Sequence, residues 1–163
     1  MLPPSRISTA GLVLRIVDSD ILSYALYDES PAHSYAWEVI KKGLLGEIEL
    51  YLTHTTILET YNVLFWFYRI RPLKKLLEKL TLTVGGLKIV EPSTMGLNVS
   101  LEDNIPLGDG FLIATALKHR IPVIISNDSH IMRNAPKHGL IADNPIPKDV
   151  REKMAEWKMP ETT

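Results

Sequence analysis

The chain has 163 residues, of which 45% are hydrophobic and 23% are charged, and its formal net charge is −1. This length and composition are typical of one globular domain with a sizeable core. The near-neutral charge provides no global basic field for nucleic acid, although a local patch can still bind it. The absence of cysteine excludes disulfides, zinc–thiolate sites and cysteine nucleophiles.

The sequence contains no apolar run of the roughly 18 residues that a membrane-spanning helix needs. Residues 1–11, MLPPSRISTAG, lack the charged region and apolar core of a signal peptide, and we expect them to form a short tail. The lack of cysteine fits a reducing compartment. We therefore expect a soluble, cytoplasmic protein without a membrane partner.

The first third of the chain predicts strands alternating with helices. Residues 12–17, LVLRIV, have the apolar, β-branched character of a strand that is buried on both faces. A short helix is expected over residues 21–27, and Pro31 opens a second helix that ends near Gly43 and Gly46. The segment EIELYLT then predicts a second strand.

The middle of the chain predicts two helices and a strand. Thr53 is a suitable N-cap for a long helix that reaches about residue 68. Its apolar stripe consists of Ile57, Tyr61, Leu64, Phe65 and Tyr68. Pro72 begins another amphipathic helix, PLKKLLEKL, and the segment LKIV predicts a second core strand.

The last third repeats the pattern of helix and strand. Pro106 opens a helix that carries Asp109, and Pro122 precedes the strand VIIS. Asp128 can begin a short helix that Gly139 ends, and residues 148–157 predict a small C-terminal helix. Strands that alternate with helices predict an α/β fold with a mainly parallel sheet.

Four acids fall where such a fold builds its site. Asp18 and Asp128 each end a strand-like run, whereas Glu59 and Asp109 lie in helical segments. In an open parallel sheet, sites form in the crevice beyond the carboxyl ends of the strands. Ionised carboxylates gathered there would repel one another by roughly 4 kcal/mol per close pair. Mg²⁺ or Mn²⁺, which prefer oxygen ligands, would remove that repulsion.

Each of these acids also has an ordinary structural role available to it. Asp109 lies in a first helical turn, where the dipole favours any carboxylate, and Asp128 is a natural N-cap. Asp18 can start the turn that leaves a strand, and Glu59 can be a solvated helix residue. The combination of all four is much less probable by chance than any one of them.

The sequence resembles the PIN-domain ribonucleases, a family that includes the toxins of VapBC toxin–antitoxin pairs. The matching segments are IVDSDIL, TTILETYNVL and PLGDGFLIATALKHRIPVIISNDSHI, in the family's order. The last is the most specific, because it joins a helix, a strand and an acid at the family's spacing. The resemblance implies a three-layer α/β/α fold over residues 12–142, followed by a C-terminal extension, residues 143–163, with a short helix.

The resemblance also implies the residues of the site. Its metal-binding and catalytic acids would be Asp18, Glu59, Asp109 and Asp128, with Mg²⁺ or Mn²⁺ as the cofactor. Asp20 is a candidate auxiliary ligand, and Ser126 and Asn127 match the polar residues that precede the last acid. The substrate would be RNA, and likeness to VapC-like proteins implies a homodimer and a cognate antitoxin protein.

Two further features bear on partners. Basic residues that could contact RNA gather between the two middle helices, at Arg69, Arg71, Lys74 and Lys75, although solvated surface explains them equally well. The segment NVLFWFYRI carries more aromatic surface than one helical stripe needs. That surplus indicates burial against a second subunit or a partner helix.

Other functions fit less well. The strand followed by Asp18-Ser19-Asp20 is similar to a haloacid-dehalogenase-type phosphatase, but Leu22 stands where that family has Thr. A receiver domain would need paired acids after its first strand and a central acceptor Asp. A non-catalytic PIN-like binding or assembly module usually lacks one or more of the four acids. An RNA-processing nuclease without an antitoxin stays open beside the toxin.

Overall fold

The computed structural model describes residues 11–156. Five parallel strands form one sheet in the order β3-β2-β1-β4-β5. Their bounds are β1 (Leu14–Val17), β2 (Glu49–Leu52), β3 (Lys88–Ile89), β4 (Val123–Ile125) and β5 (Ile141–Asp143). The expected α/β fold with a parallel sheet is confirmed.

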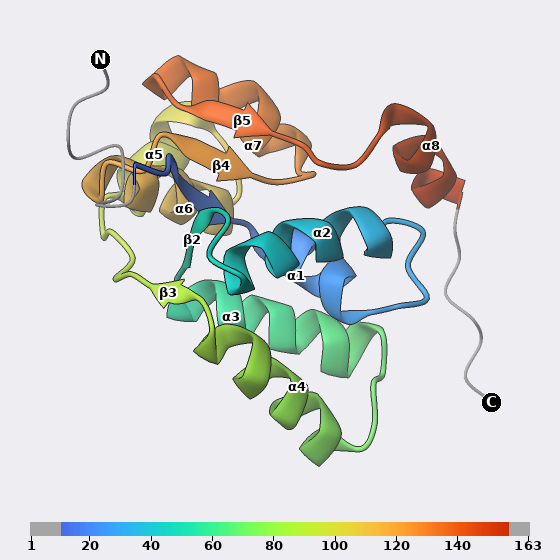
Figure 1. The fold of residues 1–163 in the computed structure, drawn as a ribbon. Coiled ribbons are helices and arrows are strands. Elements are labelled where there is room, and N and C mark those ends of the chain that lie inside the picture. The colour runs from blue at the N-terminus through green and yellow to red at the C-terminus, as the bar shows by residue number, and fades with distance from the viewer. Residues whose placement is uncertain (1–10, 157–163) are drawn as a thin grey trace.

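One face of the sheet is covered by the helices of the first half of the chain (Figure 1). These are α1 (Ser19–Leu26), α2 (His33–Leu44), α3 (His54–Asn62) and α4 (Leu73–Gly85). Val17 and Leu50 point from the strands into this core, where Ile21, Ile40 and Leu76 of the helices meet them. Residues of α1, α2 and α4 therefore share one apolar cluster with the sheet, and Ile57 and Tyr61 of α3 pack against it.

The opposite face carries α5 (Gly96–Asp103), α6 (Leu107–Lys118) and α7 (Ser129–Asn134), followed by the 3₁₀ helix η3 (Ala135–His138). Ile16 and Ile124 of the sheet form a second cluster with Val99, Ile113 and Ile131 of these helices. Neighbouring residues of β1 thus enter different cores, because side chains alternate across a strand. The result is the three-layer arrangement that the resemblance implied.

Thr53 caps α3 as expected, since its side chain accepts a hydrogen bond from the Thr56 N–H at 3.1 Å. The helix does not remain α-helical to residue 68, however. Residues Val63–Phe67 form a π-helix, η2, in which the Tyr68 N–H donates to the Val63 carbonyl at 2.9 Å. This wider turn keeps Leu64 buried while Trp66 and Phe67 stay largely exposed.

Three elements differ from the sequence-based expectation. The strand β3 exists, but it is an exposed edge strand and not a core strand, with Lys88 and Ile89 both facing solvent. Helix α5 and strand β5 were not predicted. Gly96 of α5 and Gly110 of α6 allow close approach, because a Cβ on Gly110 would lie 1.9 Å from Ser100 Oγ.

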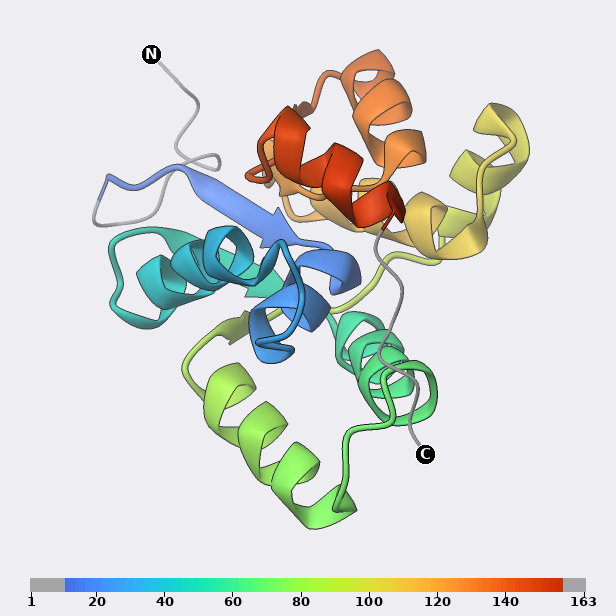
Figure 2. The same cartoon turned by 90° about the vertical axis from the view of Figure 1, so that its right-hand side faces the viewer.

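The C-terminal helix α8 (Lys148–Glu156) continues from β5, and Val150 is buried in the same core as α1 and α2. In Figures 1 and 2, α8 lies in the same half of the molecule as α7, whereas α4 extends away in the other half. The expected tail, apart from Gly11, and Trp157 lie outside the described residues. Within the described part of the chain, every helix is too short or too polar to cross a membrane.

Candidate active site

Asp18 lies where β1 ends and α1 begins. Its backbone N–H donates to the carbonyl of Ile125 at 2.9 Å, which fixes it beside the end of β4. The Oδ1 atom caps α1 by accepting the Ser19 N–H at 2.7 Å, and Oδ2 accepts the Ser126 hydroxyl at 2.7 Å. The carboxylate is therefore buried and held from both sides.

Asp128 follows the next strand and is tied to Asp18 through Ser126. The Asp128 N–H donates to Ser126 Oγ at 2.9 Å, and that hydroxyl in turn donates to Asp18. Asp128 Oδ1 accepts the N–H groups of His130 at 2.7 Å and Ile131 at 3.4 Å, which confirms its N-cap role on α7. One serine hydroxyl thus links the acids of two neighbouring strands.

Glu59 reaches the same region from α3. Its Oε2 atom accepts the Ser19 hydroxyl at 3.0 Å. A Cβ built on Gly108 would lie 3.2 Å from Glu59 Oε1, so the carboxylate rests against the first turn of α6. The partial positive charge of a helix N-terminus favours a carboxylate there.

Asp109 completes the group from that first turn of α6, with 8% of its surface exposed. Burial is the largest of the effects that together raise the pKa of Asp109 to about 7, followed by the negative charges of Asp128, Asp18 and Glu59 and a hydrogen bond with Asp128. Burial is also the largest of the effects that raise the pKa of Asp18 to about 6; the charges of Glu59 and Asp128 add to it, whereas hydrogen bonds from Ser126 and Ser19 lower it. The charges of the other three acids therefore all act on Asp109.

The donor chemistry of this group fits a hard divalent cation, because four neighbouring carboxylates supply only oxygen ligands. Among residues 11–156, however, no three acidic or histidine side chains already form a group that could hold a metal ion. Asp109 forms a hydrogen bond with Asp128. A metal would require its carboxylate ligands to be deprotonated.

The structure also places the auxiliary residues. Asp20 lies in the first turn of α1, and its Oδ2 atom accepts the Asn127 N–H at 3.0 Å, while burial raises its pKa. Ser126 is fully buried between Asp18 and Asp128. The side chain of Asn127 does not turn to those acids, since its Oδ1 atom accepts from Asn144 Nδ2 at 2.8 Å.

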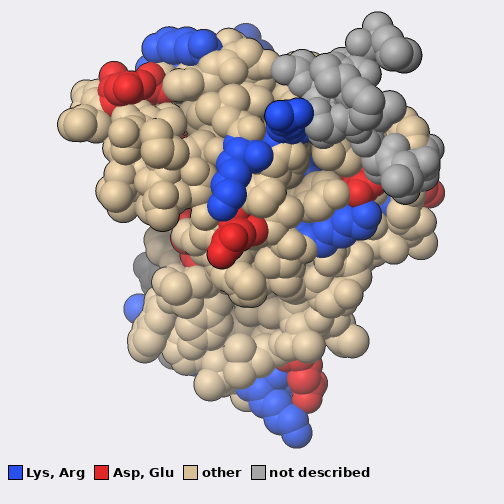
Figure 3. All heavy atoms as spheres, turned by 90° about the vertical axis from the view of Figure 1, so that its left-hand side faces the viewer, with Lys and Arg blue, Asp and Glu red and all other residues tan. Residues whose placement is uncertain are grey.

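The basic residues expected to contact RNA lie elsewhere. Arg69 follows η2, ten residues after Glu59 in the sequence. Arg71 stacks on the Phe65 ring at 3.6 Å and donates to two backbone carbonyls, so it stabilises this turn. Lys74 is exposed, 4.0 Å from Glu78. Figure 3 shows one face of the molecule, on which lysine, arginine and acidic side chains lie in small separated groups without a large patch of one sign.

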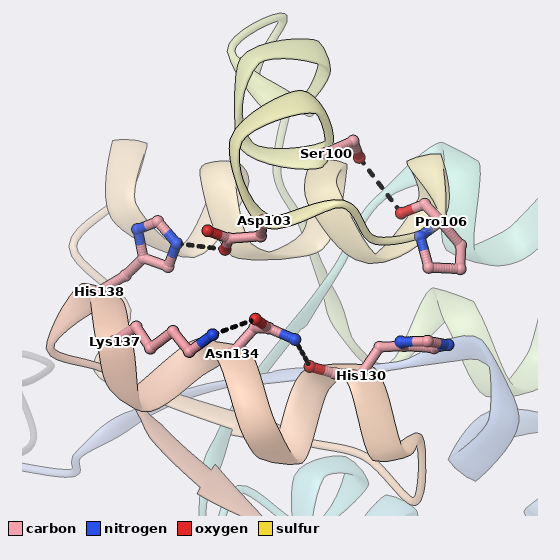
Figure 4. Close-up of polar contacts among 7 residues, drawn as sticks. All are labelled: Ser100, Asp103, Pro106, His130, Asn134, Lys137 and His138. Atoms are coloured by element: carbon pink, nitrogen blue, oxygen red, sulfur yellow. Dashed lines mark hydrogen bonds and ion pairs between the residues drawn. The ribbon is translucent and has the colours of Figure 1, made fainter.

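A second polar cluster lies between α5 and η3. His138 Nε2 contacts Asp103 Oδ2 at 2.7 Å, and Lys137 donates to the side chain of Asn134 at 3.0 Å (Figure 4). In the same view, the ring of His130 points away from Lys137 and His138. These contacts link η3 to α5 and to α7, and they involve none of the four acids.

Sequence reasoning missed Ser19, Gly108 and Asn144 as parts of the site. Ser19 had a usable signal, since a hydroxyl between two acids after a strand is well placed to orient them. Neither Gly108 nor Asn144 has such a signal in the sequence. The role of Gly108 depends on the packing of α6 beside α3, and that of Asn144 depends on the path of the chain after β5.

The comparisons with known proteins agree with this geometry. The family model of the PIN domain matches residues 15–137, and no curated protein matches the chain. Among solved structures it is similar to PAE2754 from Pyrobaculum aerophilum, at 21% identity and a TM-score of 0.58 over 90% of this chain and 99% of that one. It is also similar to the structure of VapBC2 from Rickettsia felis bound to a DNA fragment from their promoter, at 14% identity and a TM-score of 0.55 over 80% of this chain and 97% of that one. Because the family model covers more than half of its length, this chain belongs to the PIN-domain family.

Proposed function

We propose that this protein is a metal-dependent endoribonuclease that hydrolyses RNA phosphodiester bonds. PIN domains are generally nucleases, and they typically use divalent metals. The observation that carries the proposal is the convergence of four acids, from two strand ends and two helices, beyond the carboxyl ends of β1 and β4, where the charges of Asp18, Glu59 and Asp128 act on the buried Asp109. A purely structural use of these residues would not require their charges to meet.

The four acids take different parts in this proposal. Asp18 and Asp109 are the principal metal ligands, since they are the most buried of the four. Glu59 completes the ligand set or orients a water molecule from its place beside Gly108. Asp128 holds a second ion or acts through water.

A bound Mg²⁺ or Mn²⁺ would supply Lewis acidity, which polarises the scissile phosphate and lowers the pKa of an attacking water. The protein's own contribution is to hold the carboxylates in place before the substrate arrives. Ser126 and Ser19 do this, because each donates its hydroxyl to an acid, Asp18 and Glu59 respectively. Such supporting hydrogen bonds tune metal sites almost as strongly as the ligands do.

The proposal is tested by incubating a mixture of structured and single-stranded RNA with the protein and Mg²⁺, Mn²⁺ or EDTA. We expect cleavage with either metal, none with EDTA, and none with Asp109→Asn. Asp149→Asn, in an exposed first turn of α8, is the matched control and should cleave normally. Cleavage that persists in EDTA, or that Asp109→Asn retains, would contradict the proposal.

We further propose that the protein acts as a VapC-like toxin, with a second subunit and an antitoxin as protein partners. The support is an apolar groove of about 560 Å³ between α3 and α4, lined in part by Ile57, Leu58 and Tyr61. Beside it, Trp66 and Phe67 are 66% and 60% exposed. An RNA-processing nuclease without an antitoxin would use the same acids, and growth arrest on expression, relieved by a co-expressed neighbouring gene product, would separate the two.

A further inference from the structure

Asn127, the residue before Asp128, is contacted by three residues from two separate segments of the chain, α1 and the segment after β5. Its N–H donates to Asp20 Oδ2 at 3.0 Å, and its Oδ1 atom accepts from Asn144 Nδ2 at 2.8 Å. Its side chain also forms a hydrogen bond with Tyr24. A half-buried residue with so many fixed contacts has little freedom to move, and the next residue shares that restraint.

Asp20 uses both carboxylate oxygens for backbone N–H groups. Oδ1 accepts from Ile21 at 2.7 Å while Oδ2 accepts from Asn127, which is 107 positions away in the sequence. This carboxylate therefore joins the start of α1 to the turn after β4, and its orientation follows from that contact.

Asn144 fixes the same residue from the C-terminal side. Its Oδ1 atom accepts the Ile146 N–H at 3.0 Å, so its amide group is oriented before it reaches Asn127. Ile146 and Val150 are 1% and 7% exposed in the main core, which anchors this segment firmly. Asn144 lies beyond residues 15–137, the part of the chain that the family model matches.

We propose that Asp20 and Asn144 are positioning residues that hold Asn127, and through it Asp128, in the geometry that the site requires. This proposal rests on the proposed nuclease function for its kinetic consequences. Asp20 then acts through the backbone of the Asn127 turn and is not a metal ligand. Asn144, in the C-terminal extension, then helps to hold the residues of the active site in position.

The first test reads the contact itself, in protein without metal. The amide resonance of Asn127 is followed by ¹H–¹⁵N NMR in EDTA for Asp20→Ala, Asp20→Asn and Asn144→Ala. We expect Asp20→Ala to move this resonance upfield, because the hydrogen-bond acceptor is lost, and Asp20→Asn to move it less, because an amide oxygen can still accept. Asp28→Ala and Asn98→Ala, both exposed, are the matched controls. An Asn127 resonance that Asp20→Ala leaves in place would overturn the proposal.

The second test separates positioning from metal binding. We expect Asp20→Ala to lower kcat on the order of 10-fold to 100-fold with little change in KM, and Asp20→Asn to recover activity to within about threefold of the unmodified protein. Asn144→Ala should lower kcat by less. If Asp20→Asn weakens Mn²⁺ binding as much as Asp109→Asn does, Asp20 is a ligand and the proposal is wrong. Because the NMR and Mn²⁺ measurements need no substrate, they decide the proposal even if no RNA is cleaved.

Discussion

The two ends of the α3–η2 helix differ in how their polar residues are used. Near its start, the carboxylate of Glu59 accepts a hydrogen bond from Ser19 and rests against Gly108. At its far end, Arg71 packs on Phe65 and donates to the backbone, while Trp66 is left exposed. We call this far end, residues 63–75, the aromatic arm. The carboxylate of Glu59 lies near the other acids of the site. The guanidinium of Arg71, in contrast, stabilises the turn that follows η2.

This difference indicates that the proposed catalytic acids and the proposed binding surface occupy different parts of the molecule. The strand ends and two helices bring acids together at an unfavourable place, since burial and then the charges of neighbouring acids raise the pKa of Asp18 and Asp109. On the aromatic arm, Trp66 and Phe67 are exposed, and a separate apolar groove lies between α3 and α4. Substitutions at the two places should therefore change different properties of the protein.

The largest effect is expected for Asp109→Asn, which should lower RNA cleavage by at least about 100-fold. The same change should stabilise the metal-free protein above neutral pH. The folded state holds the Asp109 proton up to a pKa of about 7, whereas the unfolded state loses it near the ordinary aspartate pKa of 3.8. The free energy of unfolding therefore falls as pH rises from roughly 4 to 7, and the asparagine removes that loss.

Urea denaturation in EDTA at about pH 5 and about pH 8 measures this effect, and the advantage of Asp109→Asn should be larger at the higher pH. Asp103→Asn offers a comparison, since Asp103 contacts His138 and lies apart from the four acids. Equal stability of Asp109→Asn and the unmodified protein at both pH values would show that the acids do not repel one another.

Ser126→Ala should have the next largest effect. Its hydroxyl donates to Asp18 and accepts from the Asp128 N–H, so its loss leaves two acids without their shared support. We expect metal affinity or kcat to fall roughly 10-fold to 100-fold. Ser129→Ala, at an exposed neighbouring position, is the control, and Mn²⁺ calorimetry with cleavage kinetics is the measurement. Unchanged values would remove Ser126 from the site.

Gly108→Ala should have an intermediate effect. The added methyl group would lie 3.2 Å from Glu59 Oε1, so the carboxylate must shift by a few tenths of an ångström. We expect kcat to fall roughly tenfold, as a misplaced metal-site contact does, with the fold retained. Gly85→Ala is the matched control, because no atom lies within 4 Å of its added Cβ. If both alanine variants cleave RNA equally well, Glu59 does not need its present position.

The smallest catalytic effect is expected on the aromatic arm. Replacing Arg69, Arg71, Lys74 and Lys75 by glutamine should leave kcat unchanged but weaken RNA binding and flatten its salt dependence. Lys41→Gln with Lys42→Gln, exposed on α2, is the control. Fluorescence anisotropy over a salt series measures both quantities. RNA affinity and salt dependence that stay the same would remove this cluster as an RNA contact.

Much of the fold follows from local sequence. Residues 12–17 and the run VIIS are apolar enough to form strands only where both faces are buried, and β1 and β4 are central in the sheet. Thr53, Asp128 and Pro106 mark helix starts through local capping or a fixed backbone angle. These signals depend on the sequence within a few residues, so they are readable without a structure.

The remaining features depend on contacts between distant segments. Leu97 and Leu101 of α5 are exposed, so the helix has a weak apolar pattern and is placed by its close approach to α6. The three residues of β5 gain strand structure only by pairing with β4. The acids were predictable because strand ends meet at one sheet edge, but Asn144 reaches Asn127 only through the path of the chain after β5.

The most direct test of the account is Mn²⁺ calorimetry at about pH 8, where the folded-state pKa of Asp109, about 7, leaves its carboxyl mostly ionised. The unmodified protein is compared with Asp18→Asn, Glu59→Gln, Asp109→Asn and Asp128→Asn. If the four acids form one metal site, every one of these variants binds Mn²⁺ more weakly, with Asp18→Asn and Asp109→Asn the weakest. Binding that none of the four changes, or no binding by the unmodified protein, would contradict the claim that these carboxylates hold a metal.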